Sequence, residues 1–348
     1  MATLKEIADR VGVSVTTVSR VINYDETLSI TPEKRRLIFE VAEELEYETP
    51  RSKKKARSTK KPAAAKIRVG LIHFSSVNEE LQDPFYLAIR IGVEKKCQEY
   101  NFEIVKIYGN EHVFPLEQMK SMDGLIVIGK FSLTDIRLFQ AQCANIVTVD
   151  SAPLEETIDS VVVEVDTAIE KILAFAVDQG FTKIGYFGWK ETLPDYRTPL
   201  GEKRYAAYVG YLQSRGLFNS DYVYLGDEYS KSRDGYTLFM EAYDKHLLPE
   251  LIVAGNDSEA IGIMKAIREK GLRIPEDISI TGMNDIPIAQ YTFPPLTTVK
   301  FYSEYMGETA VDLLKERFEH RRIPKKVTLP CRLIIRESCR TAEKPADA

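Results

Sequence analysis

The chain has 348 residues, of which 44% are hydrophobic and 28% charged, and its formal net charge is −5. This is the composition of an ordinary globular protein, and the length predicts two or three domains. No apolar run is long enough to cross a bilayer, and the N-terminus lacks the basic segment and apolar core of a secretory signal. We therefore expect a cytoplasmic protein.

The cysteines are scattered through the chain and form no C-x-x-C pair. This spacing indicates neither a zinc site nor a disulfide framework. We expect reduced, mostly buried thiols, and neither a metal nor a cofactor. The cysteines are Cys97, Cys143, Cys331 and Cys339.

Residues 3–23 predict two short helices joined by a tight turn. Four apolar residues recur at i, i+3, i+4 and i+7 in the first helix: Leu4, Ile7, Ala8 and Val11. Gly12 supplies the permissive backbone of the corner, and Ser14 caps the second helix. The residues of the second helix that point back at the first are Val18, Val21 and Ile22.

The second helix presents mainly small polar residues outward: Val15, Thr16, Thr17, Ser19 and Arg20. A solvated face usually favours Glu and Lys, whereas Thr, Ser and Arg suit phosphate oxygens and base edges in a major groove. The alternative is an ordinary amphipathic helical hairpin. A third helix is predicted to begin at Pro32 with Thr31 as its N-cap. The three helices would form a small all-α, DNA-binding headpiece over residues 1–48.

The run V-S-V-T-T-V-S-R-V-I-N at residues 13–23 resembles the N-terminal signature of the LacI/GalR family of bacterial transcriptional repressors. The resemblance implies that Val15 and Thr16 discriminate between operators and that Arg20 contacts a base or a phosphate. The implied DNA contacts of the headpiece are Thr3, Ser14, Val15, Thr16, Thr17, Ser19, Arg20 and Asn23. Members of the family dock as dimers on near-palindromic sites, so we expect a homodimer that is associated with the nucleoid when bound to its operator.

A basic linker is predicted over residues 49–66. No acidic residue lies within residues 51–66, and such a block attracts phosphate whatever the base sequence. Its candidate DNA contacts are Arg51, Lys53, Lys54 and Lys55. The alternative is a solubilising spacer. In the family a leucine of this linker inserts into the minor groove. This linker has no leucine, so either Ala56 takes that place or basic side chains carry the hinge contacts.

From Ile67 onward, short apolar runs alternate with stretches that are typical of helices. The predicted strands are residues 67–74, 102–108, 124–128, 146–149, 183–187, 251–254 and 278–282. The predicted helices are residues 84–100, 166–179, 201–215, 232–246 and 257–270. This order predicts an α/β fold of doubly wound parallel sheets, and its length favours two lobes.

Polar and aromatic residues follow these predicted strands, where ligands bind in open parallel sheets. They are Asp83, Phe85, Tyr86, Asp150, Trp189, Asn256, Asp257, Asn284 and Asp285. Carboxylates and amides beside aromatic faces suit a polyhydroxylated ring. The sequence therefore predicts a sugar site between the loops.

The family resemblance also covers this body, most clearly at residues 252–267 and 275–299. It implies two lobes of the periplasmic-binding-protein type that are joined by three crossovers. The lobes would be residues 67–162 with 301–327, and residues 163–300 with 328–340. The implied effector-binding residues are Phe85, Tyr86, Asp150, Trp189, Arg204, Asn256 and Asn284. Trp189 would either stack on a sugar or belong to the core. Similarity is greatest to repressors of galactoside operons, which implies galactose or a galactoside as the effector.

Several of these residues have a structural alternative. Asp150 could cap a loop, Asn256 or Asp257 could cap the helix that follows, and Asn284 could form a turn. We expect Asp257 and Asp285 to be structural rather than ligand-binding.

The resemblance implies a homodimeric repressor whose operator affinity is switched by a small sugar. The sign of the switch is open, because some relatives use a corepressor. The alternatives are a global regulator of the same fold controlled by a partner protein, a transport-associated sugar-binding protein, and a sugar kinase or glycosidase. The sequence has neither a phosphate-cradling Gly-rich loop nor a nucleophile elbow, so we expect no catalytic residues and no enzyme activity.

Overall fold

The computed structural model describes residues 3–22, 25, 28, 30–45, 66–74, 84–107, 114–154, 156–189, 203–226 and 231–341, apart from the side chains of residues 32, 43 and 231–234. The chain forms two compact units, Met1–Lys66 and Ile67–Ala348.

Three helices make up the first unit: α1 (Leu4–Val11), α2 (Val15–Ile22) and α3 (Pro32–Glu44). Thr3 begins α1 with a capping box, in which its hydroxyl accepts from the Glu6 amide while the Glu6 carboxylate accepts from the Thr3 amide. Gly12 ends α1 at φ 70°, a left-handed conformation that favours glycine. The helices enclose a core of Ile7, Ala8, Val18, Val21, Ile22, Ile38 and Val41. The predicted helix-turn-helix and its third helix are confirmed.

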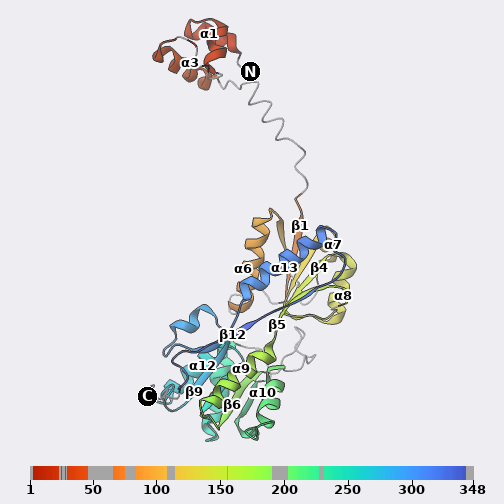
Figure 1. Cartoon of the computed structure of the whole chain (residues 1–348), viewed down its shortest axis with the longest axis vertical. Coiled ribbons are helices and arrows are strands. Elements are labelled where there is room, and N and C mark those ends of the chain that lie inside the picture. Colours follow the sequence, from red (N-terminus) through yellow and green to blue (C-terminus); the bar gives the residue numbers. More distant parts are fainter. Residues whose placement is uncertain are drawn as a thin grey trace, which may run out of the picture. The chain divides into compact units, whose positions relative to one another are not determined.

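The first lobe of the second unit is built on a parallel sheet of order β11-β5-β4-β3-β1-β2. Its strands are β1 (Arg68–His73), β2 (Glu103–Ile107), β3 (Gly124–Ile128), β4 (Ile146–Val149), β5 (Asp159–Val163) and β11 (Lys326–Leu329). Its helices are α6 (Pro84–Glu99), α7 (Leu116–Lys120), α8 (Leu133–Gln142) and α13 (Ser303–Phe318). Helices α6 and α13 pack against each other beside this sheet (Figure 1).

The second lobe is built on a sheet of order β12-β10-β9-β8-β6-β7. Its strands are β6 (Ile184–Trp189), β7 (Val223–Gly226), β8 (Leu251–Ala254), β9 (Ser279–Asn284), β10 (Thr297–Phe301) and β12 (Cys331–Ile334). Its helices are α9 (Val165–Asp178), α10 (Lys203–Gln213), α11 (Lys231–Asp244) and α12 (Asp257–Glu269), with the short 3₁₀ helices η1 (Ser220–Tyr222) and η2 (Pro287–Tyr291). All pairs are parallel except β10 with β12, which is antiparallel.

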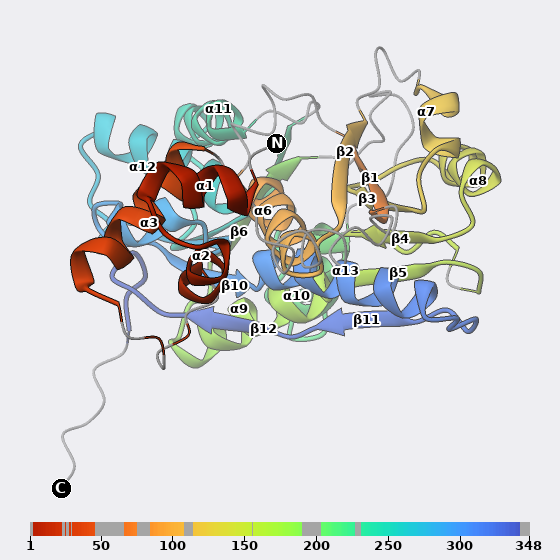
Figure 2. The same ribbon diagram turned by 90° about the horizontal axis from the view of Figure 1, so that it is seen from above.

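Along the described residues the chain passes between the two sheets three times: after β5, after β10, and between β11 and β12. Figure 2 shows β11 and β12 end to end along this last passage. The predicted fold of two α/β lobes is confirmed. Both sheets bury apolar side chains, and in the described parts of the chain no helix is both long and apolar enough to span a membrane.

Several elements were missed by the sequence pattern: β5, β7, β10, β11 and β12, and helices α7, α8 and α13. The missed strands have four or five residues each, and none of them contains more than three consecutive Val, Ile or Leu residues. They therefore lack a longer apolar run such as the Leu-Ile-Val-Ile stretch of the buried strand β3.

Candidate functional site

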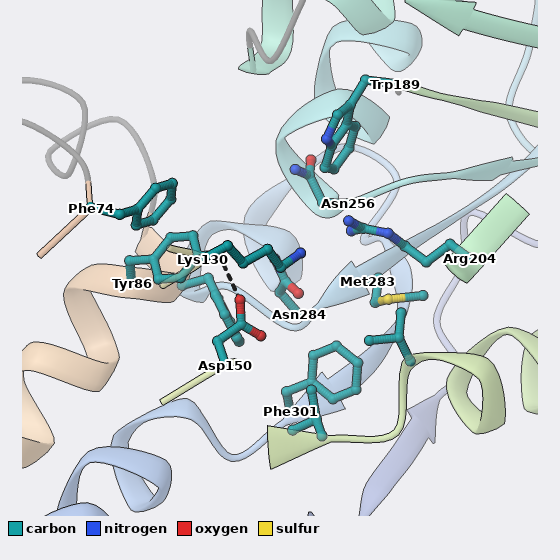
Figure 3. A pocket seen from close by; sticks show the side chains of 13 residues that line it. Phe74, Tyr86, Lys130, Asp150, Trp189, Arg204, Asn256, Met283, Asn284 and Phe301 are labelled. Atoms are coloured by element: carbon teal, nitrogen blue, oxygen red, sulfur yellow. Dashed lines mark hydrogen bonds between the residues drawn. The ribbon is translucent and has the colours of Figure 1, made fainter. Parts of the chain in front are cut away.

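A pocket lies between the two sheets, beyond the carboxyl ends of their strands (Figure 3). The empty space between its walls, open solvent at its mouth included, is about 610 Å³. It is lined by Phe74, Phe85, Tyr86, Lys130, Asp150, Val163, Val165, Trp189, Arg204, Asn256, Met283, Asn284 and Phe301. All the effector-binding residues inferred from the sequence are therefore brought together.

Asp150 supplies the carboxylate of the first-lobe wall. It directly follows β4 and has φ 71°, a left-handed conformation that Asp tolerates better than most residues. The Tyr86 hydroxyl, from α6, donates to Asp150 Oδ2 at 2.7 Å. The ring of Phe74 meets that of Tyr86 edge to face, with centroids 4.7 Å apart. A carboxylate accepts several hydrogen bonds, so Asp150 can accept from Tyr86 and from a ligand hydroxyl together.

Arg204 and Trp189 form part of the second-lobe wall. Arg204 Nη1 donates to the Gly255 carbonyl at 3.0 Å, and its guanidinium carbon lies 4.4 Å from the centroid of the Trp189 ring. The prediction that Trp189 follows its strand is wrong. It is the last residue of β6 and is only 4% exposed, because β6 extends two residues beyond the predicted end. It is thus both a core residue and a wall of the pocket.

Asn256 and Asn284 bring two amides to the same wall (Figure 3). Asn256 is the N-cap of α12, and its Oδ1 accepts from the Glu259 amide at 2.8 Å. Its capping role and its place in the pocket are therefore compatible, since the side-chain NH₂ can donate to a ligand. Asn284 ends β9 with φ 113°, followed by Asp285 with φ 53°. Backbone of this kind is costly and is typical of functional sites.

Asp257 and Asp285 do not line the pocket, in agreement with the structural role expected for them. Asp285 pairs with Arg336 at 2.7 Å and with Lys300 at 3.5 Å. Asp257 is fully buried at the start of α12.

The sequence reasoning missed six lining residues: Phe74, Lys130, Val163, Val165, Met283 and Phe301. Lys130 lies two residues beyond β3, so the strand-end rule could have found it. Val163, Val165 and Phe301 lie at two of the passages between the lobes. The strand-end rule could not find these three residues, because strands β5 and β10 were not predicted from the sequence.

The outward face of α2 is the candidate DNA-reading surface. Val15 is 43% exposed and Thr16 is also exposed, as the sequence predicted. Ser14 caps the helix by accepting from the Thr17 amide at 3.1 Å, and the two hydroxyls lie 2.8 Å apart. Arg20, also predicted as a DNA contact, pairs through its Nε with Asp25 Oδ2 at 2.7 Å.

Two of the remaining predicted DNA contacts lie within the described headpiece: Thr3, which is exposed and caps α1, and Ser19, which is partly buried on α2. The other predicted contacts lie outside the described residues: Asn23, Arg51, Lys53, Lys54 and Lys55.

Neither a metal centre nor a reactive thiol is found in the described residues. No group of three or more His, Cys, Asp or Glu side chains there could hold a metal ion. All four cysteines are free and buried, as predicted. Burial raises the pKa of the Cys97 and Cys339 thiols to about 12, which keeps them protonated and unreactive near neutral pH.

The sequence matches two family models: bacterial regulatory proteins of the lacI family at residues 3–50, and periplasmic binding protein-like domains at residues 173–339. It is 36% identical to the HTH-type transcriptional repressor MelR of Bacillus subtilis (strain 168), over 97% of this chain and 98% of that protein. It is 33% identical to the HTH-type transcriptional regulator GalR of Streptococcus thermophilus, over 97% and 99% of the two chains.

The fold is similar to that of a solved lac repressor dimer bound to operator and the anti-inducer ONPF. The TM-score is 0.66 at 22% identity, over 97% of this chain and 98% of that one. A solved transcriptional regulator CelR–cellobiose complex has the same TM-score at 24% identity, over 97% and 100% of the chains. These likenesses span the headpiece and the two-lobed body alike.

Proposed function

The chain belongs to the lacI family of bacterial regulatory proteins and is a transcriptional repressor of the LacI/GalR type, and we propose that galactose or a galactoside, bound between its lobes, switches its affinity for operator DNA. The observation that carries this proposal is the pocket itself. A carboxylate from the first lobe and a guanidinium and two amides from the second converge on one cavity.

The lining suits a sugar ring in its chemistry. Asp150 accepts from hydroxyls, whereas Arg204 and the amides of Asn256 and Asn284 can donate to them. The apolar faces that a sugar ring needs for its C–H groups come from aromatic, Met and Val side chains of the same cavity. The relative named GalR supports galactose or a galactoside over other sugars.

The position of the pocket supports a switch rather than simple storage of the ligand. Its walls come from both lobes, and Val163 and Phe301 lie where the chain passes between them. A ligand that contacts both walls therefore has a different affinity for each arrangement of the lobes. Such a difference is what couples two sites, and the coupling is reciprocal: DNA weakens sugar binding by the factor by which sugar weakens DNA binding.

On the DNA side we propose that Val15 and Thr16 choose the operator and that the basic linker adds attraction to phosphate. Repressors of this family bind operator DNA and act as dimers. We propose a homodimer on a near-palindromic operator, with one α2 in each half-site.

The test is a gel shift on an operator selected in vitro, with and without sugar. Calorimetric titration uses galactose, the α-galactoside melibiose and the β-galactoside lactose, with cellobiose and glucose 6-phosphate as controls. We expect a galactoside to bind and to weaken operator binding about 5- to 150-fold, the usual range of such coupling. Binding of none of the galactosides, or preferred binding of a control, would overturn the proposed effector, and tighter operator binding with sugar would reverse the proposed sign.

A further inference from the structure

The buried carboxylate of Asp257 connects the two chain segments that carry the pocket side chains Asn256 and Asn284. Asp257 directly follows Asn256 and is fully buried as the first residue of α12. Its Oδ2 accepts from the Ile286 amide at 2.8 Å, two residues beyond Asn284. Its Oδ1 accepts from the Thr298 hydroxyl of β10 at 2.5 Å. One side chain thus joins the start of α12, the turn after β9 and strand β10.

The turn that Asp257 holds is the one that orients Asn284. Asn284 and Asp285 both have positive φ, and two such residues in succession need strong local constraints. The amide of Asp285 lies 3.4 Å from the Thr298 hydroxyl, which in turn donates to Asp257. Both backbone amides that follow Asn284 are therefore connected to the Asp257 carboxylate, one directly and one through Thr298.

The packing leaves this carboxylate little room to move. A Cβ placed on Gly282 would lie 2.2 Å from Asp257 Oδ1 and 3.0 Å from a Leu296 methyl group. The strand therefore approaches the helix so closely that only glycine fits at position 282. Close packing and two hydrogen bonds together fix where β9 ends relative to α12.

We propose that Asp257 is a positioning residue that sets the place of Asn284 relative to Asn256, and thereby the affinity of the pocket for its sugar. This rests on the proposed function, since it takes the pocket to be the sugar site. Asp257 itself does not line the pocket, so its effect passes through the turn at residues 284–286. Binding groups must be held to within about 0.5 Å of their productive geometry to be effective, so the turn that carries Asn284 has to be fixed equally closely.

The charge state of Asp257 should make sugar affinity depend on pH, an effect that a purely structural residue would not produce. Burial raises the pKa of this carboxyl to about 7, although the hydrogen bonds from Thr298 and Ile286 oppose the shift. The charged groups that face it are Asp285, which raises this pKa further, and Arg336, which lowers it. The protonated carboxyl keeps both hydrogen bonds, because its carbonyl oxygen accepts from the Ile286 amide and its O–H donates to the Thr298 hydroxyl. The raised pKa means that the packed turn favours this neutral form, so ionisation loosens the turn, and sugar affinity is expected to fall as pH rises from 6 to 8.

The experiment titrates the full chain with galactose and melibiose at pH 6 and pH 8. Asp257→Ala is expected to weaken sugar binding about tenfold or more, and Thr298→Val about threefold, because each removes hydrogen bonds that hold the turn. Asp257→Asn retains an acceptor for Ile286 and a donor to Thr298 but cannot titrate. It should bind sugar with the same affinity at both pH values.

The matched control is Asp277→Ala. Asp277 also accepts from a backbone amide of the second lobe, that of Arg273 at 2.8 Å, but it is outside the pocket. We expect this variant to keep the sugar affinity of the natural chain and its dependence on pH. Operator binding without sugar, measured for every variant, shows that the protein is folded.

Amide hydrogen exchange separates this inference from the proposed function. Exchange at Asp285 and Ile286 should be faster in Asp257→Ala and Thr298→Val whether or not any sugar binds. If no sugar binds the natural chain, the proposed function fails, and exchange alone decides whether Asp257 holds the turn. Unchanged exchange in both variants would overturn the inference, as would faster exchange with unchanged sugar affinity. If Asp257→Ala does not fold, Thr298→Val and the pH profile of Asp257→Asn decide the matter.

Discussion

Replacing Arg204 with alanine should abolish or strongly weaken the response to sugar while leaving operator binding intact. Arg204 reaches the pocket from the second residue of α10, and it is held by the Gly255 carbonyl and the Trp189 ring. A guanidinium has five N–H donors, so it can bond both Gly255 and ligand oxygens. Because these contacts orient the side chain before the ligand arrives, little entropy is lost on binding.

The expected loss follows from the hydrogen bonds involved. A hydrogen bond to a charged group is worth about 1.5–3 kcal/mol. At about 1.4 kcal/mol per tenfold, the loss of one such bond weakens sugar binding about 10- to 150-fold. Arg204→Lys keeps the charge but loses the planar stack on Trp189, so we expect an intermediate loss.

Arg215→Ala is the matched control for this substitution. Arg215 also stacks on an aromatic ring, with its guanidinium carbon 3.6 Å from the Tyr211 centroid, and donates to the Tyr211 carbonyl at 3.2 Å. It lies just after α10 but outside the pocket. We expect sugar affinity within twofold of that of the natural chain, measured by calorimetry and by sugar-dependent gel shift. Equal effects of Arg204→Ala and Arg215→Ala, or no effect of Arg204→Ala, would remove Arg204 from the site.

Four further outcomes are expected. Val15→Ala or Thr16→Ala should change the preference for particular base pairs by about 1–3 kcal/mol in a binding-site selection, whereas equal weakening on every sequence would contradict base reading. Neutralising the lysines at 53–55 should flatten the dependence of operator affinity on salt, and an unchanged slope would make the linker a spacer. Burial raises the pKa of the Asp159 carboxyl, but hydrogen bonds from two arginines outweigh burial and leave the pKa below its usual value. The stability that the ionised carboxylate contributes is therefore present at neutral pH and is lost as pH falls through the lowered pKa. Asp159→Asn should therefore reduce the free energy of unfolding in urea at pH 7 by about 3–5 kcal/mol, with a much smaller difference from the natural chain at low pH. Gly92→Ala should destabilise the first lobe, because the Cβ of the new alanine would lie 1.9 Å from a carbonyl oxygen of α13. An unchanged midpoint of urea unfolding would show that helices α6 and α13 can separate without cost.

The headpiece was predictable because its determinants are local. The apolar spacing of α1 and α2, the cap at Ser14 and the corner at Gly12 all act within a few residues of one another. The same locality explains why the outward position of Val15 was predicted correctly. The ion pair of Arg20 with Asp25 was not predicted, since it depends on how the chain turns after α2.

The residues that line the pocket were partly predictable, for a different reason. Parallel strands end at the same edge of a sheet, so residues that follow them meet whatever their separation in the chain. This reasoning placed Asp150, Asn256 and Asn284 together. It did not find Val163 or Phe301, because those residues lie where the chain passes from one sheet to the other.

The sequence by itself therefore determined the class of protein, the helix-turn-helix and most of the residues that line the pocket. Only the tertiary structure decided how those residues are held. Trp189 is a strand residue stacked on Arg204, Tyr86 donates to Asp150, and Asp257 joins residues 29 and 41 positions away. The physical reason is that periodicity and capping depend on near neighbours, whereas these contacts exist only after the sheets have brought distant segments within hydrogen-bonding distance.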